Sequence, residues 1–204
     1  MKGQAFIILS IFLVLILFLV KNLSSSLNLE KEIEEFEFKN LKEEVSSVAL
    51  FSFQDYSNIS KNIEDFLRFS RNSFSSRGKI FNCFFLGVYY QNITENEQTD
   101  LNITVLNLLG HELKILNITF SYDDSSKIFY SIQDGEKIQT SFSFNISSSS
   151  NCTLKIFSFN YENWTEKIEI PLEIGKSKFI GFFSMSLENR IRIRDKFSEQ
   201  LNLR

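Results

Sequence analysis

The chain has 204 residues, 23 of them Phe, with one Pro, one His and a formal net charge of −3. This charge lacks the basic excess of a polyanion-binding protein, so we expect no nucleic-acid partner. The length allows one domain together with an anchor and a stalk.

An apolar run near the start is the first feature in chain order. It covers sixteen positions, Ala5 to Val20, with Ser10 as its only polar residue, and Lys2 and Lys21 flank it. Since a spanning helix needs about 20 apolar residues and flanking lysines can snorkel, the run predicts a transmembrane anchor. A cleaved signal peptide and a buried soluble helix are the alternatives, but the run lacks a small-residue cleavage pattern and is not amphipathic.

The residues before the run carry a family resemblance. The chain begins M-K-G-Q-A, which resembles the class III signal sequence of archaeal type IV pilin-like proteins. The resemblance implies that a prepilin peptidase cuts between Gly3 and Gln4, and that Ala5 to Val20 stays on the mature chain as an assembly helix. The family usually has Ser and Glu at the third and fifth mature positions, where this chain has Phe6 and Ile8. Because of this departure from the family pattern, a minor pilin-like protein, or an anchored protein with a similar start, fits the sequence at least as well.

Two helical stretches are expected next. Apolar residues recur at helical spacing in two stripes, which are Leu29, Ile33 and Phe36, and then Phe38, Leu41, Val45 and Val48. A second helix is expected over Ile59 to Phe74, with a stop at Arg77-Gly78. Packing of these stripes on the following domain is favoured over a coiled coil with another chain, because neither heptad run is sustained.

After Gly78 the pattern changes to short runs rich in Ile, Phe, Val, Tyr and Thr, which predict β-strands. We expect the strands at 80–90, 101–108, 112–121, 127–132, 138–146, 152–160, 164–170, 178–187 and 190–197. The Phe-rich run Ile80 to Tyr90 is also compatible with a helix. Alternating arginines in the last strand suggest a protected sheet edge.

These elements define the predicted fold class and domains. The fold is α+β, with an N-terminal transmembrane helix and a helical neck followed by a mainly antiparallel β-sandwich. The predicted parts are an anchor at 1–20, a neck at 21–78 and an extracytoplasmic sandwich at 79–204. The acid-rich segment after the anchor favours this orientation, with the C-terminal domain outside the cytoplasm.

Sequons support an exported domain. The N-x-[ST] pattern occurs more often than chance arrangement would give, although a bias towards Asn and Thr contributes to it. Sequons are acceptors for glycans only on the exported side of a membrane. The candidates are Asn22, Asn58, Asn92, Asn102, Asn117, Asn145, Asn151 and Asn163.

Cys83 and Cys152 are the only cysteines. Outside the cytoplasm they are predicted to form a disulfide between two strands, and two unrelated buried thiols are the alternative. With the lone His111 they do not make a closed zinc site, so no metal or other cofactor is expected. Motifs for a nucleophilic serine or a phosphate loop are absent from the sequence, and we expect no enzymatic activity.

The sequence therefore predicts a membrane-anchored structural or adhesive protein, a pilin-like component of the cell surface. The alternative is an anchored β-sandwich that recruits a ligand or partner without forming filaments. Expected partners are membrane lipid and other pilin-like subunits or cell-surface proteins.

Overall fold

The computed structural model describes residues 2–52, 58–90, 98–120, 125–145, 152–159, 165–172, 177–189 and 191–203. Within them the chain forms two compact units, Met1–Glu43 and Glu44–Arg204. The helices are α1 (Lys2–Phe51) and α2 (Ile59–Ser76). The strands are β1 (Ile80–Tyr90), β2 (Gln98–Leu108), β3 (Leu113–Phe120), β4 (Ser125–Ile132), β5 (Lys137–Asn145), β6 (Cys152–Phe159), β7 (Thr165–Leu172), β8 (Ser177–Glu188) and β9 (Arg192–Leu203).

The N-terminal part corrects the predicted fold class. α1 is one continuous helix of 50 residues, where the sequence predicted an anchor followed by a separate neck. Among the described residues, no helix is both long and apolar enough to cross a membrane. The run from Ala5 to Val20 is shorter than the roughly 20 apolar residues of a typical span, and Lys21 and a polar segment follow it. The predicted fold class, with its transmembrane helix, is therefore wrong, and the described residues form mostly antiparallel sheet together with α1 and α2.

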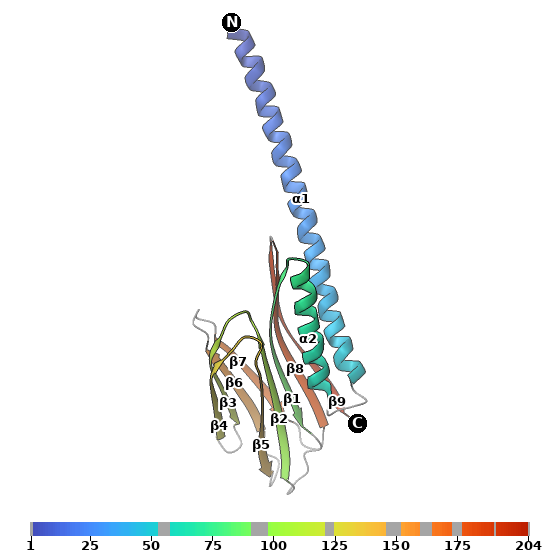
Figure 1. Ribbon diagram of the computed structural model, residues 1–204, viewed down its shortest axis with the longest axis vertical. Helices are drawn as coiled ribbons and strands as arrows, with labels where there is room; N and C mark the ends of the chain where they lie inside the picture. Colours follow the sequence, from blue (N-terminus) through green and yellow to red (C-terminus); the bar gives the residue numbers. More distant parts are fainter. Residues whose placement is uncertain are drawn as a thin grey trace. The chain divides into compact units, whose positions relative to one another are not determined.

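The strands form two antiparallel sheets (Figure 1). The larger sheet has the order β5-β2-β1-β8-β9 and the smaller has the order β4-β3-β6-β7. β1 is central: Leu86 is opposite Val105 of β2 on one side and Phe182 of β8 on the other. β9 is an edge strand, as its alternating cations predicted.

One apolar core lies between the two sheets. Because successive side chains of a strand point to opposite faces, every second residue of β1 enters this core. The core also takes residues from β2, β3, β5, β7 and β8, so it joins the larger sheet to the smaller one. Its fully buried members include Leu86, Val88, Tyr90, Val105, Leu116 and Phe120.

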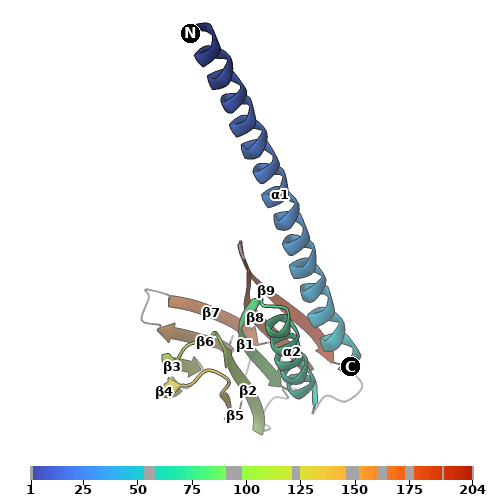
Figure 2. The same cartoon turned by 45° about the horizontal axis from the view of Figure 1, so that its top comes forward.

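The opposite face of the larger sheet is covered by α2, as both ribbon views show (Figure 2). Gly87 of β1 is paired in register with Gly181 of β8. A Cβ added at Gly87 would lie 2.9 Å from the Phe85 ring and 3.1 Å from Ser60 Oγ of α2. The paired glycines therefore let the helix and the aromatic rings approach the sheet closely.

The ends of the helices are fixed by specific contacts. The amide of Lys79 donates to the carbonyl of Phe74, and Gly78 has a φ of 72°, which is the conformation of a glycine after a helix C-terminus. In the last turns of α1, Val45 is fully buried, and Ser46 Oγ donates to Glu199 Oε1 of β9 at 2.5 Å. The second unit therefore includes the end of α1 as well as α2.

Candidate functional site

The most connected polar residue of the protein is Asn107, near the end of β2. Its side chain is fully buried. β2 carries Asn107 between Leu106 and Leu108, both buried, so the fold places an amide in an apolar setting. A buried amide without partners would destabilise the fold, and its hydrogen bonds therefore show what it holds in place.

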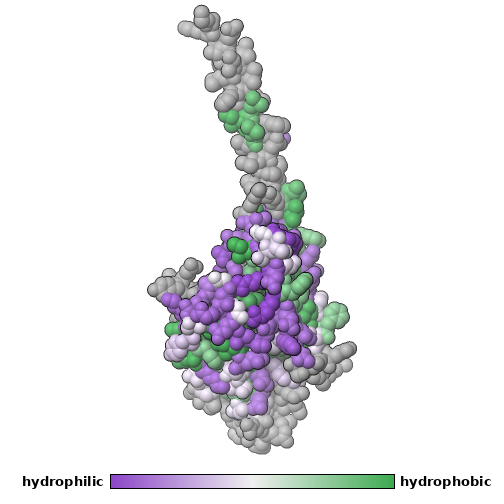
Figure 3. Space-filling view, in the orientation of Figure 1, coloured by the Kyte–Doolittle hydropathy of each residue, from purple (hydrophilic) through white to green (hydrophobic). Residues whose placement is uncertain are grey.

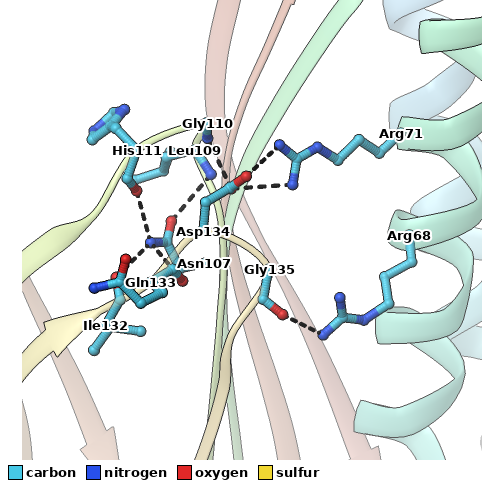
Figure 4. Close-up of polar contacts among 10 residues, drawn as sticks. All are labelled: Arg68, Arg71, Asn107, Leu109, Gly110, His111, Ile132, Gln133, Asp134 and Gly135. Carbon is cyan, nitrogen blue, oxygen red and sulfur yellow. Dashed lines mark hydrogen bonds and ion pairs between the residues drawn. The ribbon is translucent and has the colours of Figure 1, made fainter.

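Asn107 joins two loops (Figure 4). Its Nδ2 donates to the carbonyl of His111, at 3.0 Å, and to the carbonyls of Ile132 and Gln133, at 3.0 and 3.3 Å. Its Oδ1 accepts the amide of Leu109, at 3.1 Å. The backbone of Asn107 also bonds the β4–β5 turn, because its carbonyl accepts the amide of Gly135, at 2.7 Å. Asn107 therefore fixes the β2–β3 loop against the β4–β5 turn.

Asp134 extends these contacts to α2. Its Oδ1 accepts the amide of Gly110 in the β2–β3 loop, at 2.9 Å. The guanidinium of Arg71 on α2 binds both carboxylate oxygens, at 3.1 and 2.6 Å. Such two-point pairing of arginine with a carboxylate fixes the orientation of both groups.

A second ion pair lies one turn earlier on α2. Glu64 Oε1 accepts Arg68 Nε at 2.9 Å, and its Oε2 lies 2.7 Å from Lys137 Nζ at the start of β5. Arg68 also donates to the carbonyl of Gly135, at 2.8 Å. We call the set of Asn107, Asp134, Arg71, Arg68, Glu64 and Lys137 the loop clamp.

The two carboxylates of the loop clamp are held in their charged form. Burial raises the pKa of Glu64, but hydrogen bonds from Lys137 and Arg68 outweigh it, so this pKa is lowered from its ordinary value. Burial likewise raises the pKa of Asp134, but the hydrogen bonds from Arg71 and from the Gly110 amide lower it by more. The net shift of both groups is downwards.

The loop clamp is suited to holding structure and not to chemistry. The bonds described above occupy its carboxylates and guanidinium groups, and they join the Asn107 amide to backbone groups of the two loops. In the part of the chain that the structure describes, His, Cys, Asp and Glu side chains form no group of three or more that could hold a metal ion. The loop clamp therefore holds the β2–β3 loop and the β4–β5 turn against α2.

The predicted site residues are spread over the fold. Gly3 and Gln4 lie in the first turn of α1, and Asn22 further along it, with side chains outside the described residues. Asn102 of β2 is exposed, whereas Asn117 of β3 and Asn58 beside α2 are half-buried. Asn145 ends β5, with its side chain not described, and three further sequons lie outside the described residues: Asn92, Asn151 and Asn163. The sequon that the structure presents best for modification is therefore Asn102.

The cysteines and the histidine are not brought together. Cys83 is a free thiol in β1, fully buried, and burial raises its pKa. Cys152 begins β6 of the other sheet, and its side chain is outside the described residues. The structure thus gives the predicted disulfide no support. His111 is exposed in the β2–β3 loop and contributes its carbonyl to Asn107.

The loop clamp was not found from the sequence. Asp134-Gly135 is a typical turn dipeptide between the strands predicted at 127–132 and 138–146, but nothing in the sequence pairs it with Arg71. A weak signal existed at Asn107, the one polar residue in the run from Val105 to Leu109. A lone amide in an apolar strand end indicates a buried hydrogen-bonding role.

Comparison with protein-family models and with curated protein sequences found no match.

Replacing Asn107 with Asp tests the loop clamp directly. The substitution turns a donor of three hydrogen bonds into a carboxylate that faces three carbonyl oxygens. We expect Asn107→Asp to lower the free energy of unfolding by about 3–5 kcal/mol at pH 7. Asn202→Asp, the same change at an exposed position of β9, should stay within about 0.5 kcal/mol of wild type in urea unfolding. The Asn107→Asp deficit should be smallest below about pH 4, where a protonated Asp can donate; a pH-independent deficit would contradict this account.

The ion pairs of the loop clamp predict an acid dependence of stability. Both folded-state pKa values are lowered from ordinary values of 4.5 for Glu64 and 3.8 for Asp134. The contribution of the two carboxylates to the free energy of unfolding is therefore complete above those ordinary pKa values. It is lost as the pH falls through the folded-state pKa values. Unfolding measured from pH 7 to pH 2 should show a shallower loss for Glu64→Gln/Asp134→Asn than for wild type. Asp65→Asn, at an exposed position of α2, should keep the wild-type slope. If stability fell equally steeply with pH in all three proteins, the ion pairs would be ruled out as the source of the acid dependence.

Asn102 gives the sharpest test of glycosylation. Its side chain is exposed on the larger sheet and begins the sequence Asn-Ile-Thr. In chain purified from its native source, Asn102→Gln should lower the intact mass by that of one glycan. Asn189→Gln, an exposed Asn outside any sequon, should leave the glycan mass unchanged. A wild-type chain whose mass equals that of its amino acids would refute the prediction.

Proposed function

We propose that this protein is a structural component of the cell surface, pilin-like in its way of assembling, whose α1 packs against α1 of further subunits. The proposed location is the cell membrane, with the β-strand unit outside the cytoplasm. The observation that carries the proposal is the row of exposed apolar side chains along α1. The loop clamp offers no competing enzymatic role, because its polar groups bond to one another.

The length of α1 supports an assembly role. At a rise of 1.5 Å per residue, its 50 residues extend about 75 Å. Helices of globular proteins average about 10–14 residues, because a longer helix outgrows the core on which it packs. A helix of this length offers most of its surface to partners.

Apolar side chains are exposed along α1, and five of them lie at positions that form one row; Ile16 and Leu17, also exposed, lie outside that row. Figure 3 shows apolar side chains on the described portion of this helix. Successive members of the row are three, four or ten residues apart, which is the spacing of a heptad seam. Positions 22 and 26 of the same seam are polar in sequence. The row consists of Leu15, Leu19, Leu29, Ile33 and Phe36, which are 49–65% exposed.

The exposed row on α1 bears on the choice between packing on the chain's own domain and contact with another chain. Burial of one Leu, Ile or Phe side chain contributes about 1.5–3 kcal/mol. Burial of both stripes was the favoured expectation. The second stripe meets it, since Phe38, Leu41 and Val45 are buried, but Leu29, Ile33 and Phe36 of the first stripe are exposed. Their exposure favours the alternative, which is contact with another chain. Lys31 and Glu35, also exposed, form an ion pair beside the row, which keeps the neighbouring surface polar.

The assembly role of α1 is testable with paired substitutions. Leu29→Lys/Ile33→Lys places two charges in the row, and we expect it to weaken association of the full chain at least about a hundredfold, since two buried side chains are lost from each contact. Lys31→Glu/Glu35→Lys exchanges the charges of the neighbouring ion pair on the same turns and should associate as wild type does. Chemical cross-linking followed by sedimentation measures both.

A wild-type chain that stays monomeric at its cell-surface concentration would contradict the proposal. That outcome would leave the alternative function, an anchored binding module that does not polymerise. Association that the two lysines leave unchanged would mean that the contact lies elsewhere on the chain.

A further inference from the structure

The second feature left without a partner is β4, an edge strand of the smaller sheet. It pairs with β3 on one side and has no strand neighbour on the other among the described residues. Its outward-facing side chains include Ile128 and Tyr130, which are 47% and 70% exposed. The outward residues Ser126, Ile128 and Tyr130 carry no charge. The one charged residue of β4, Lys127, is on the inward face and donates to Thr140 and Ser141 of β5. An edge strand whose outward face is uncharged and bears exposed apolar residues is a template for another strand.

The other three sheet edges are each protected. β9 carries the exposed cations Arg192, Arg194 and Lys196 at alternate positions. On β5, Lys127 Nζ donates to the carbonyl of Ser141 at 2.5 Å and so occupies a group of that edge. β7 contains Pro171, which has no N–H to donate to a neighbour. Charge, a capping lysine and proline are the usual devices against edge pairing, and β4 alone lacks one on its outward face.

We propose that β4 pairs with β4 of a second copy of the chain, antiparallel and centred on Ile128. The extended conformation of β4 is interrupted at Ser131, which has a φ of 59°, so residues 126–130 are its regular part. Pairing about Ile128 uses residues 126–130 of both copies and sets Ile128 opposite its own counterpart, with Tyr130 opposite Ser126. Centring the pair on Lys127 would set two ammonium groups opposite each other, which destabilises a cross-strand pair.

Charge favours a second β4 over a partner's β9 as the occupant. In the proposed register Lys127 lies opposite Phe129, so like charges do not meet. A partner's β9 would bring three cations to a strand that has no acidic residue to receive them. Self-pairing is therefore the arrangement that the charge pattern of β4 accommodates.

The contact is expected to be weak by itself. One pair of five-residue strands buries less than the roughly 800 Å² per partner of a standard interface. Its affinity rises when the copies are already held close together, since the second contact then forms within an assembly. The inference goes beyond the proposed function of α1, and its test reports on β4 alone.

Disulfide trapping in the full-length chain tests the register. Under mild oxidation, Ile128→Cys should form a covalent dimer, because directly opposite residues have Cα atoms about 4.5–5.5 Å apart. Tyr130→Cys is the matched control on the same face of the same strand: its two copies would lie four residues apart, roughly 13 Å, which is beyond disulfide reach. We expect at least about tenfold more dimer from Ile128→Cys, with wild type giving the background from the native cysteines.

A third variant separates specific pairing from collision. Adding Tyr130→Lys to Ile128→Cys places a charge on the edge and should reduce the dimer yield to that of Tyr130→Cys. Leu29→Lys/Ile33→Lys in the same background distinguishes the two proposals, because it removes the α1 contact and leaves the β4 edge intact. Equal dimer yields from Ile128→Cys and Tyr130→Cys, or no dimer from Ile128→Cys at high protein concentration, would overturn the β4 pairing.

Discussion

The fold depends on one constraint: the larger sheet is covered on both faces. The smaller sheet packs on one face and α2 on the other, so β1 and β8 are buried at most positions. A Cβ added at Gly87 or Gly181 would lie against the surrounding Phe rings, and at Gly87 also against Ser60 of α2. Phe85 and Phe183 stack at 5.1 Å in the resulting layer. The positions of α2, and hence of Arg68 and Arg71, follow from that layer.

The loop clamp supplies hydrogen-bond partners for the loops that connect the two sheets. The β2–β3 loop and the β4–β5 turn both connect the two sheets, and loops near a core leave backbone groups that need partners. Asn107 satisfies carbonyls of both loops at once, and Asp134 and Glu64 connect them to α2. The polar groups at the centre of the protein are thereby bonded internally. Recognition is left to its outer surfaces.

The sequence predicted the strands well and the special contacts poorly. The strand expected at 80–90 is β1, and the helix expected at 59–74 is α2 with two more residues, because periodicity and turn residues are local signals. The ambiguity of the Phe-rich run Ile80 to Tyr90 arose from its burial on both faces, which removes alternation. The predicted transmembrane helix is not found among the described residues, and its sixteen-residue apolar run is short for a span. Asn107 and its partners lie up to 26 residues apart, and such pairing follows from the fold and not from spacing.

α1 and β4 present two surfaces of different strength and kind. The row on α1 contains five large apolar side chains, whereas the β4 edge contains two and relies on backbone hydrogen bonds. A row of apolar residues associates strongly but fixes register weakly, since neighbouring registers also bury apolar area. A strand pair is weak but register-specific, because a slip of one residue exchanges the faces of the strand. The two contacts are therefore complementary: α1 would bring subunits together, and β4 would set how neighbouring β-strand units meet.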